Sequence, residues 1–129
     1  MMKISDFVTG VQHIGLPTND MKATEAFYLG LGFEKIYETM NGKERVCFFQ
    51  MGTVVFESYE NGCAAERYGA IDHISLNVTD VEKVYALVTA RGEKVVSNGI
   101  EQLPFFKNGV RFFTIEGPNK EKLEFNQYL

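Results

Sequence analysis

The sequence predicts an α+β fold in which two βαβββ modules form a curled, cup-like mixed sheet with helices on the outer face. Three observations support this prediction. The chain repeats itself after about 60 residues, each copy opens with the alternating pattern of a strand, and a helical pattern follows it. A chain of 129 residues is long enough for one domain, which the repeats divide at about 8–61 and 69–129.

The repeat is visible when the chain is compared with itself at a shift of 60 residues. Identical residues then pair, namely His13 with His73, Asp20 with Asp80 and Gly32 with Gly92. Further along, Glu57 pairs with Glu124 at a shift of 67. A loop insertion in the second copy explains this drift. We therefore interpret the chain as two copies of one supersecondary unit.

Each copy is expected to contain one strand, one helix and three further strands. The expected strands are 11–16, 34–38, 45–50 and 54–59 in the first copy, and 73–78, 93–97, 110–116 and 122–128 in the second. Apolar stripes at helical spacing follow the first strand of each copy. Asn19 or Asp20 is expected to cap the first helix, and a capping box of Thr79 and Glu82 the second.

Strand alternation places four ionisable side chains on the faces away from the helices. These are His13, Glu57, His73 and Glu124. Singly, each histidine fits a structural role, and Glu57 fits an edge-strand glutamate that reaches solvent. They are, however, the two histidines of the chain, and they occupy equivalent repeat positions. Two imidazoles and two carboxylates converging in a cup would suit Zn²⁺, Ni²⁺, Co²⁺, Mn²⁺ or Fe²⁺.

Composition excludes several other classes of protein. The net charge is −4 and the basic residues are scattered, so no nucleic-acid partner is expected. No apolar run approaches the ~20 residues of a membrane span, and the first ten residues lack the apolar region of a signal peptide. Cys47 and Cys63 fit no metal-binding spacing and are expected to be reduced thiols. These features predict a cytoplasmic protein that binds no membrane.

The sequence resembles the vicinal oxygen chelate superfamily, which includes glyoxalase I, methylmalonyl-CoA epimerase, extradiol dioxygenases, and fosfomycin-resistance and bleomycin-binding proteins. The resemblance extends from about Val8 to Leu129. It is carried by four segments, namely Val11–Leu16, Ala26–Phe33, Ile71–Leu76 and Gly117–Phe125. The two histidine and two glutamate positions fall at the ligand positions of the family.

Within the superfamily, a His-Glu-His-Glu set is most similar to glyoxalase I. The resemblance implies a metal-dependent lyase or isomerase that converts a hemithioacetal, or a related α-hydroxycarbonyl, through a metal-bound enediolate. It implies Zn²⁺ or Ni²⁺ as the cofactor, with Mn²⁺, Co²⁺ or Fe²⁺ also suited to the ligands. Glu57 and Glu124 would be ligands and catalytic acid/base groups, in an order that the sequence leaves open. A homodimer is also implied, with the site formed within one chain or across two.

The thiol co-substrate is less well defined by the resemblance. Pro17 occupies the position of an arginine that holds glutathione in glyoxalase I, whereas Asn61 matches an asparagine used for the thiol cofactor. Lys107 lies in a loop suited to the same task, and Arg67 is a candidate substitute for the missing arginine. Glutathione and another thiol therefore both remain open.

Three alternatives to a glyoxalase I activity stay open. An epimerase on this scaffold would exchange a substrate α-hydrogen without forming a new product. An Fe²⁺-dependent dioxygenase would consume O₂ with a catechol. A metal-free resistance or binding protein would carry uncharged residues at the four ligand positions, and this sequence has four good ligands there. Four aromatic side chains are candidates for a pocket wall or for the core, namely Phe105, Phe106, Phe112 and Phe113.

Overall fold

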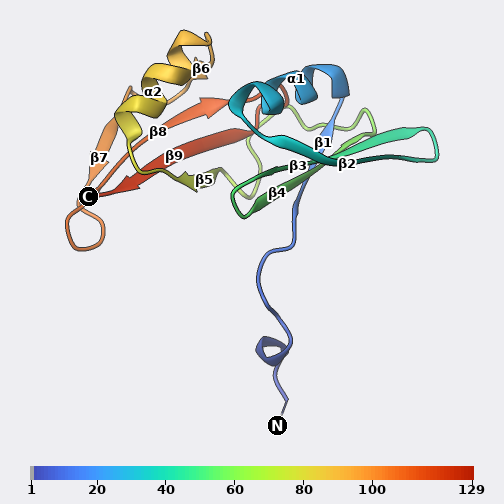
Figure 1. Ribbon diagram of the computed structural model, residues 1–129, viewed down its shortest axis with the longest axis horizontal. Coiled ribbons are helices and arrows are strands. Elements are labelled where there is room, and N and C mark those ends of the chain that lie inside the picture. Colours follow the sequence, from blue (N-terminus) through green and yellow to red (C-terminus); the bar gives the residue numbers. More distant parts are fainter. Residues whose placement is uncertain (1) are drawn as a thin grey trace.

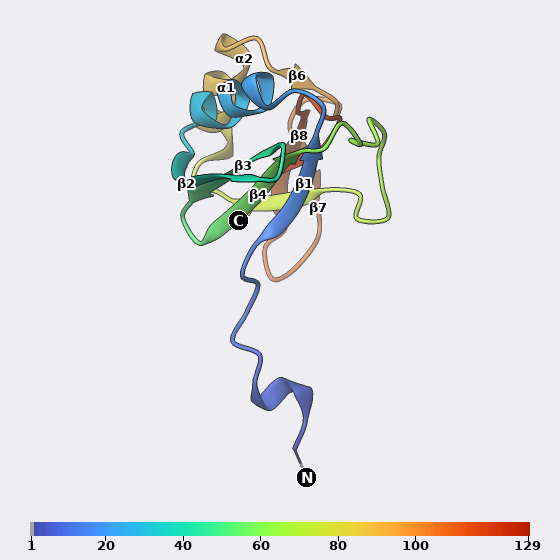
Figure 2. The ribbon, with the colours of Figure 1, turned by 90° about the vertical axis from the view of Figure 1, so that its right-hand side faces the viewer.

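A computed structural model describes residues 2–129 of the chain, which form two βαβββ halves (Figure 1). The first half contains β1 (Ile14–Thr18), α1 (Met21–Leu31), β2 (Glu34–Asn41), β3 (Glu44–Met51) and β4 (Val54–Glu60). The second contains β5 (Ile74–Asn77), α2 (Val81–Ala90), β6 (Lys94–Val95), β7 (Glu101–Leu103), β8 (Val110–Glu116) and β9 (Lys122–Tyr128). A short 3-10 helix, η1 (Ile4–Asp6), precedes them on a segment that extends away from the body (Figures 1 and 2).

The two halves have the same strand order. The first sheet runs β1-β4-β3-β2 and the second β5-β9-β8-β6, with β7 also paired to β8. The first strand of each half is parallel to the last, and the other pairings are antiparallel. The expected α+β fold is therefore confirmed, as two curled sheets that share no ladder within residues 2–129.

Two details of the expected strands were wrong. The expected strand 93–97 is only β6, because the chain then turns through Gly99 with a φ of +63° and adds β7, which the pattern did not indicate. The first strand of each half starts at Ile14 or Ile74, so His13 and His73 lie one residue before their strands.

Each helix is capped by an aspartate at the same repeat position. The Asp20 carboxylate accepts a hydrogen bond from the Ala23 amide, as expected. In α2 the Asp80 carboxylate accepts from the Lys83 amide, so the predicted capping box starting at Thr79 was wrong by one residue. The extended backbone of Asp80, with φ −152° and ψ 92°, aims its short side chain at that amide.

The core lies between the helices and the sheets, and it is continuous across the two halves. Both helices lie on the same side of the sheets, α1 over the first and α2 over the second (Figures 1 and 2). The strand residues expected to face the helices are buried, including Phe56, Leu123 and Phe125. Their alternating neighbours therefore face away from the helices.

Polar contacts join the halves at the turn between β8 and β9. The Asn119 side chain contacts the hydroxyls of Thr18 and Thr24, at 3.1 and 3.0 Å. The buried Tyr28 hydroxyl of α1 donates to Glu121 Oε2 at 2.9 Å. These bonds fix the first half against the second, because both threonines and Tyr28 are fully buried.

Candidate metal centre

In the first half, parallel pairing of β1 and β4 brings His13 to Glu57. Gly15 lies opposite Glu57 in the ladder, so His13 projects from the same face two residues earlier. The His13 Nε2 atom lies 3.5 Å from Glu57 Oε1. On the other side of the ring, Nδ1 lies 3.0 Å from the Gln12 side-chain oxygen. Since that oxygen only accepts, Nδ1 carries the hydrogen of this bond.

The second half repeats this arrangement with β5 and β9. The His73 Nε2 atom lies 3.5 Å from Glu124 Oε2. Its Nδ1 atom donates to Asp72 Oδ2 at 2.9 Å, and Lys122 Nζ approaches the other oxygen of Asp72 at 3.2 Å. The bond from His73, and then that from Lys122, hold the pKa of the Asp72 carboxyl below its ordinary value. An anionic partner on Nδ1 makes the ring a stronger ligand through Nε2.

The separation of the ligand atoms fits a divalent ion. Two ligands of a tetrahedral ion, each bound at about 2.0–2.1 Å, lie roughly 3.3 Å from each other. The imidazole–carboxylate separation is 3.5 Å in both halves. In both halves Nε2 is the ring nitrogen that faces the carboxylate, and Nε2 is one of the two nitrogens through which histidine binds a metal. Each half therefore carries one imidazole and one carboxylate at a separation that a divalent ion could bridge.

One chain does not gather all four ligands. Across residues 2–129, no three His, Cys, Asp or Glu side chains lie close enough together to hold one ion. Each expected His–Glu pair is thus formed, but the two pairs lie apart from each other. Two ligands would leave a tetrahedral ion half coordinated, so neither pair alone would complete such a site.

The other candidate residues lie away from the histidines. Asn61 follows β4, and its side-chain oxygen accepts a hydrogen bond from the Cys63 amide, which holds the loop. Lys107 is exposed in the loop between β7 and β8. Of the four phenylalanines, Phe113 is in the core, Phe112 is half-buried, and Phe105 and Phe106 are exposed on the same loop. Both cysteines are free thiols, as expected.

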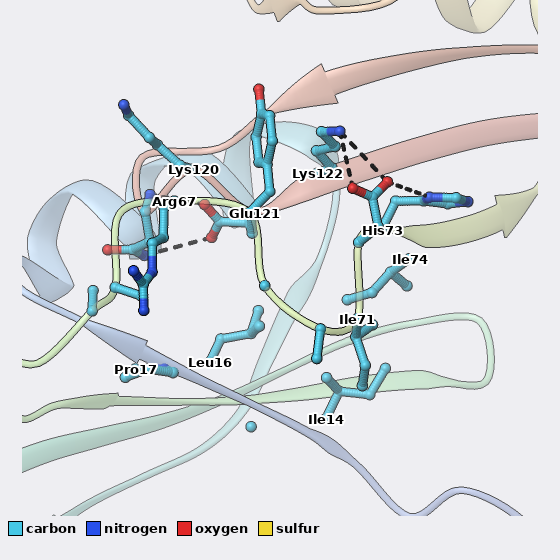
Figure 3. A pocket seen from close by; sticks show the side chains of 18 residues that line it. Ile14, Leu16, Pro17, Arg67, Ile71, His73, Ile74, Lys120, Glu121 and Lys122 are labelled. Atoms are coloured by element: carbon cyan, nitrogen blue, oxygen red, sulfur yellow. Dashed lines mark hydrogen bonds and ion pairs between the residues drawn. The ribbon is translucent and has the colours of Figure 1, made fainter.

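A pocket of about 400 Å³ lies between β1 and the turn that precedes β9 (Figure 3). Arg67, Lys120 and Lys122 line it, together with apolar side chains of β1. His73 stands at its edge with the ring directed away from the pocket (Figure 3). His13, Glu57 and Glu124 are not among its lining residues, so His73 is the one member of the two His–Glu pairs that reaches this pocket.

The sequence analysis did not single out the residues that contact the two His–Glu pairs. Gln12 and Asp72 each precede a histidine, and Ser75 and Asn126 bond to Glu124. A signal was present for the first two, because they occupy equivalent repeat positions directly beside the histidines. Ser75 and Asn126 have no such signal, since the equivalent residues in the first half are of different types.

Paired βαβββ halves with a histidine–glutamate pair on each open face define a class of proteins. The chain belongs to the Glyoxalase/Bleomycin resistance protein/Dioxygenase superfamily, whose family model matches residues 10–125. This confirms the resemblance to the vicinal oxygen chelate superfamily. Across the described residues, no helix is long and apolar enough to span a membrane.

Individual relatives share this fold. The chain is 30% identical over 126 residues to the uncharacterized protein YwbC of Bacillus subtilis (strain 168), which covers 91% of this chain and 96% of YwbC. The structure of this chain is similar to that of the fosfomycin resistance protein FosX from Listeria monocytogenes, with a TM-score of 0.74, 18% identity and 95% coverage of both chains. It is also similar to the lactoylglutathione lyase from Agrobacterium tumefaciens, with a TM-score of 0.70, 20% identity, and coverage of 93% of this chain and 94% of that one. At these identities the two solved structures show a common fold.

Proposed function

We propose that the protein is a metal-dependent lyase or isomerase of the glyoxalase I type that acts as a homodimer. In this proposal His13 and Glu57 of one chain and His73 and Glu124 of a second chain hold one Zn²⁺ or Ni²⁺ ion. The observation that carries the proposal is the pair of matched imidazole–carboxylate separations of 3.5 Å, one in each half. A second chain is required because the two pairs lie apart within one chain.

The proposed substrate is a hemithioacetal or a related α-hydroxycarbonyl. The bound ion would supply positive charge to the two adjacent oxygens of such a substrate. The chain would supply carboxylates within reach of the two substrate carbons that carry these oxygens, because Glu57 and Glu124 belong to the same four-ligand set. A carboxylate would take the proton from one carbon and return a proton to its neighbour. Asn61 and Lys107 remain candidates for binding the thiol part of the substrate.

Subunit mixing tests the shared site. In a site formed across two chains, a His13→Ala chain paired with a His73→Ala chain has one site lacking both histidines and one that is intact. Each variant alone has only damaged sites. Random mixing at equal amounts makes about half of the dimers mixed, so about a quarter of the wild-type sites should be recovered.

The measurements are bound Zn²⁺ or Ni²⁺ per chain and chelator-sensitive conversion of methylglyoxal with a panel of thiols. Recovery of tight metal binding in the mixture, absent from each variant alone, is the expected result. Wild-type protein that binds no divalent ion would contradict the metal site. Binding without recovery on mixing would contradict the two-chain arrangement. Bound metal with no conversion of any hemithioacetal would contradict the glyoxalase I type of reaction.

A further inference from the structure

The N-terminal arm (residues 2–11) leaves the body of the molecule as an extended segment. It runs away from both sheets (Figures 1 and 2), and within residues 2–129 its hydrogen bonds are made inside the arm itself. The side chains of Phe7, Val8 and Val11 are 69%, 60% and 79% exposed. Apolar side chains exposed together along one segment are typical of a surface that contacts another molecule.

An open apolar groove of about 1060 Å³ lies between the two halves of the chain. It is lined by β5 and α2 of the second half, and by the end of α1 and the β3–β4 turn of the first. Ile74, Leu76 and Val78 of β5 face the core, yet all three are only half-buried in the single chain. Leu87 of α2 also lines the groove and is 66% exposed. The core is therefore left open along this groove.

The groove and the arm are complementary in charge as well as in apolar surface. Arg91, at the end of α2, is the one charged residue among the described residues that line the groove. Its guanidinium is 37% exposed and reaches the Glu93 carboxylate only at 3.5 Å. Asp6 directly precedes Phe7 in the arm, so a carboxylate lies next to the aromatic side chain of the arm. An apolar segment with one carboxylate suits an apolar groove with one guanidinium.

From these features we infer that the N-terminal arm of one chain docks into the apolar groove of a second copy of this chain, with Phe7 between the halves and Asp6 beside Arg91. The exchange is reciprocal in a two-fold dimer, so two arms fill two grooves and neither groove stays open. The inference goes beyond the proposed function. It requires a second copy, but neither a metal ion nor a reaction.

The path of the arm favours the groove of a second copy over its own. Val11 lines the groove of its own chain, so the arm starts at the border of that groove. Beyond Val11 the arm runs outward (Figures 1 and 2), and a Cβ at Gly10 would meet no atom within 4 Å. To fill its own groove, the chain would have to reverse direction between Phe7 and Val11. Docking into a second copy keeps the extended path.

Sedimentation equilibrium tests the role of Phe7. The dimer dissociation constant is measured with EDTA present, so that no metal ion contributes, for wild type, Phe7→Ser and Phe106→Ser. Phe7→Ser should weaken the dimer at least tenfold, the usual effect of removing a buried aromatic side chain from an interface. Phe106 is the matched control, because it is 76% exposed and lies on the loop between β7 and β8. Phe106→Ser should change the constant less than twofold. Circular dichroism checks that each variant is folded.

Disulfide trapping tests which groove the arm enters. Cys63 is the exposed thiol and is first replaced by serine, whereas Cys47 is buried and stays. A Val8→Cys chain is then mixed with a Leu87→Cys chain that carries a mass tag, and a disulfide between the two chains should form on oxidation. Lys83→Cys is the control for Leu87→Cys, because Lys83 also lies on α2, is 84% exposed and does not line the groove. It should form no such disulfide.

Three outcomes would overturn the inference. The first is wild-type protein that is monomeric at every concentration, or a dissociation constant that Phe7→Ser leaves unchanged. The second is a disulfide that forms only within a chain carrying both Val8→Cys and Leu87→Cys, since the arm would then occupy its own groove. The third is an apolar small molecule that copurifies in the groove while Phe7→Ser has no effect.

The result is independent of the proposed function. A dimer that depends on Phe7, in protein that binds no Zn²⁺ or Ni²⁺, would support the arm exchange and contradict the metal site. Metal binding in a dimer that Phe7→Ser leaves unchanged would support the metal site and contradict the arm exchange.

Discussion

Replacement of Tyr28 by phenylalanine removes one hydroxyl that joins the two halves of the chain. The hydroxyl is fully buried and donates to Glu121 Oε2 at 2.9 Å, across 93 positions of the sequence. Burial, and then the nearby Glu121 carboxylate, raise the pKa of Tyr28 well above its ordinary value, so the hydroxyl remains a donor at every working pH. The ring itself packs against Phe56 and Phe33, with centroids 5.4 and 5.2 Å away, and phenylalanine keeps those contacts.

The expected loss is therefore that of one hydrogen bond to a charged acceptor. Such a bond contributes about 1.5–3 kcal/mol, and the carboxylate left behind keeps only its contacts with Asn119. We expect Tyr28→Phe to lower the free energy of unfolding by about 2 kcal/mol. For a chain of this length, that corresponds to a fall in melting temperature of roughly 6–10 °C.

Tyr85→Phe is the matched control. Tyr85 lies in α2 and packs edge-on against Phe113 at 5.1 Å, and its hydroxyl has no hydrogen-bond partner in the described chain. The same chemical change there should cost less than about 0.5 kcal/mol. Both variants are unfolded in urea and followed by far-ultraviolet circular dichroism. Equal stabilities for the two variants would refute the reasoning, because the buried bond to Glu121 would then contribute nothing.

Two further predictions concern the same turn and the outer face of the first sheet. A Cβ at Gly117 would lie 2.5 Å from Glu121 Cδ, so Gly117→Ala should push Glu121 off Tyr28 and lower the free energy of unfolding by about 2 kcal/mol. When Gly117→Ala is combined with Tyr28→Phe, the two losses measured by urea unfolding should be less than additive. Fully additive losses would contradict a shared cause. Hydrogen bonds from Lys35, then from Arg45, lower the pKa of the Glu38 carboxyl from 4.5 to about 2. The contribution of Glu38 to stability is present above pH 4.5 and is lost as the pH falls toward 2. Between these pH values the urea midpoint of Glu38→Gln should therefore fall less than that of wild type. Equal falls in the two midpoints would exclude Glu38 as a source of acid sensitivity.

The sequence was sufficient to predict which face of each strand carries chemistry. Side chains alternate strictly along a strand, so the burial of Phe56 and Leu123 places Glu57 and Glu124 on the opposite faces. The ladder then brings each glutamate beside the histidine of its own half. Such short-range geometry depends only on the period of the strand and on the repeat, and both can be read from one sequence.

Contacts between the halves could not be predicted in this way. The bond from Tyr28 to Glu121 depends on how one half packs on the other, and neither residue differs in type from ordinary core or turn residues. For the same reason, the sequence left open whether the four ligands meet within one chain. The answer lies in the packing of two rigid modules, about which strand alternation carries no information.

The duplicated halves share one arrangement of side chains and differ in the residues around it. The histidine, the glutamate and the residue that bonds Nδ1 recur at equivalent positions, so the imidazole–carboxylate separation is common to both halves. The differences are confined to the neighbours of the carboxylate, where Gly15 and Tyr59 stand in place of Ser75 and Asn126. These differences leave the imidazole–carboxylate separation at 3.5 Å in both halves, and they give hydrogen bonds from Ser75 and Asn126 to Glu124. A repeated fold can thus keep one geometry in both halves, because the ladder sets that geometry, while the neighbours of a single side chain diverge.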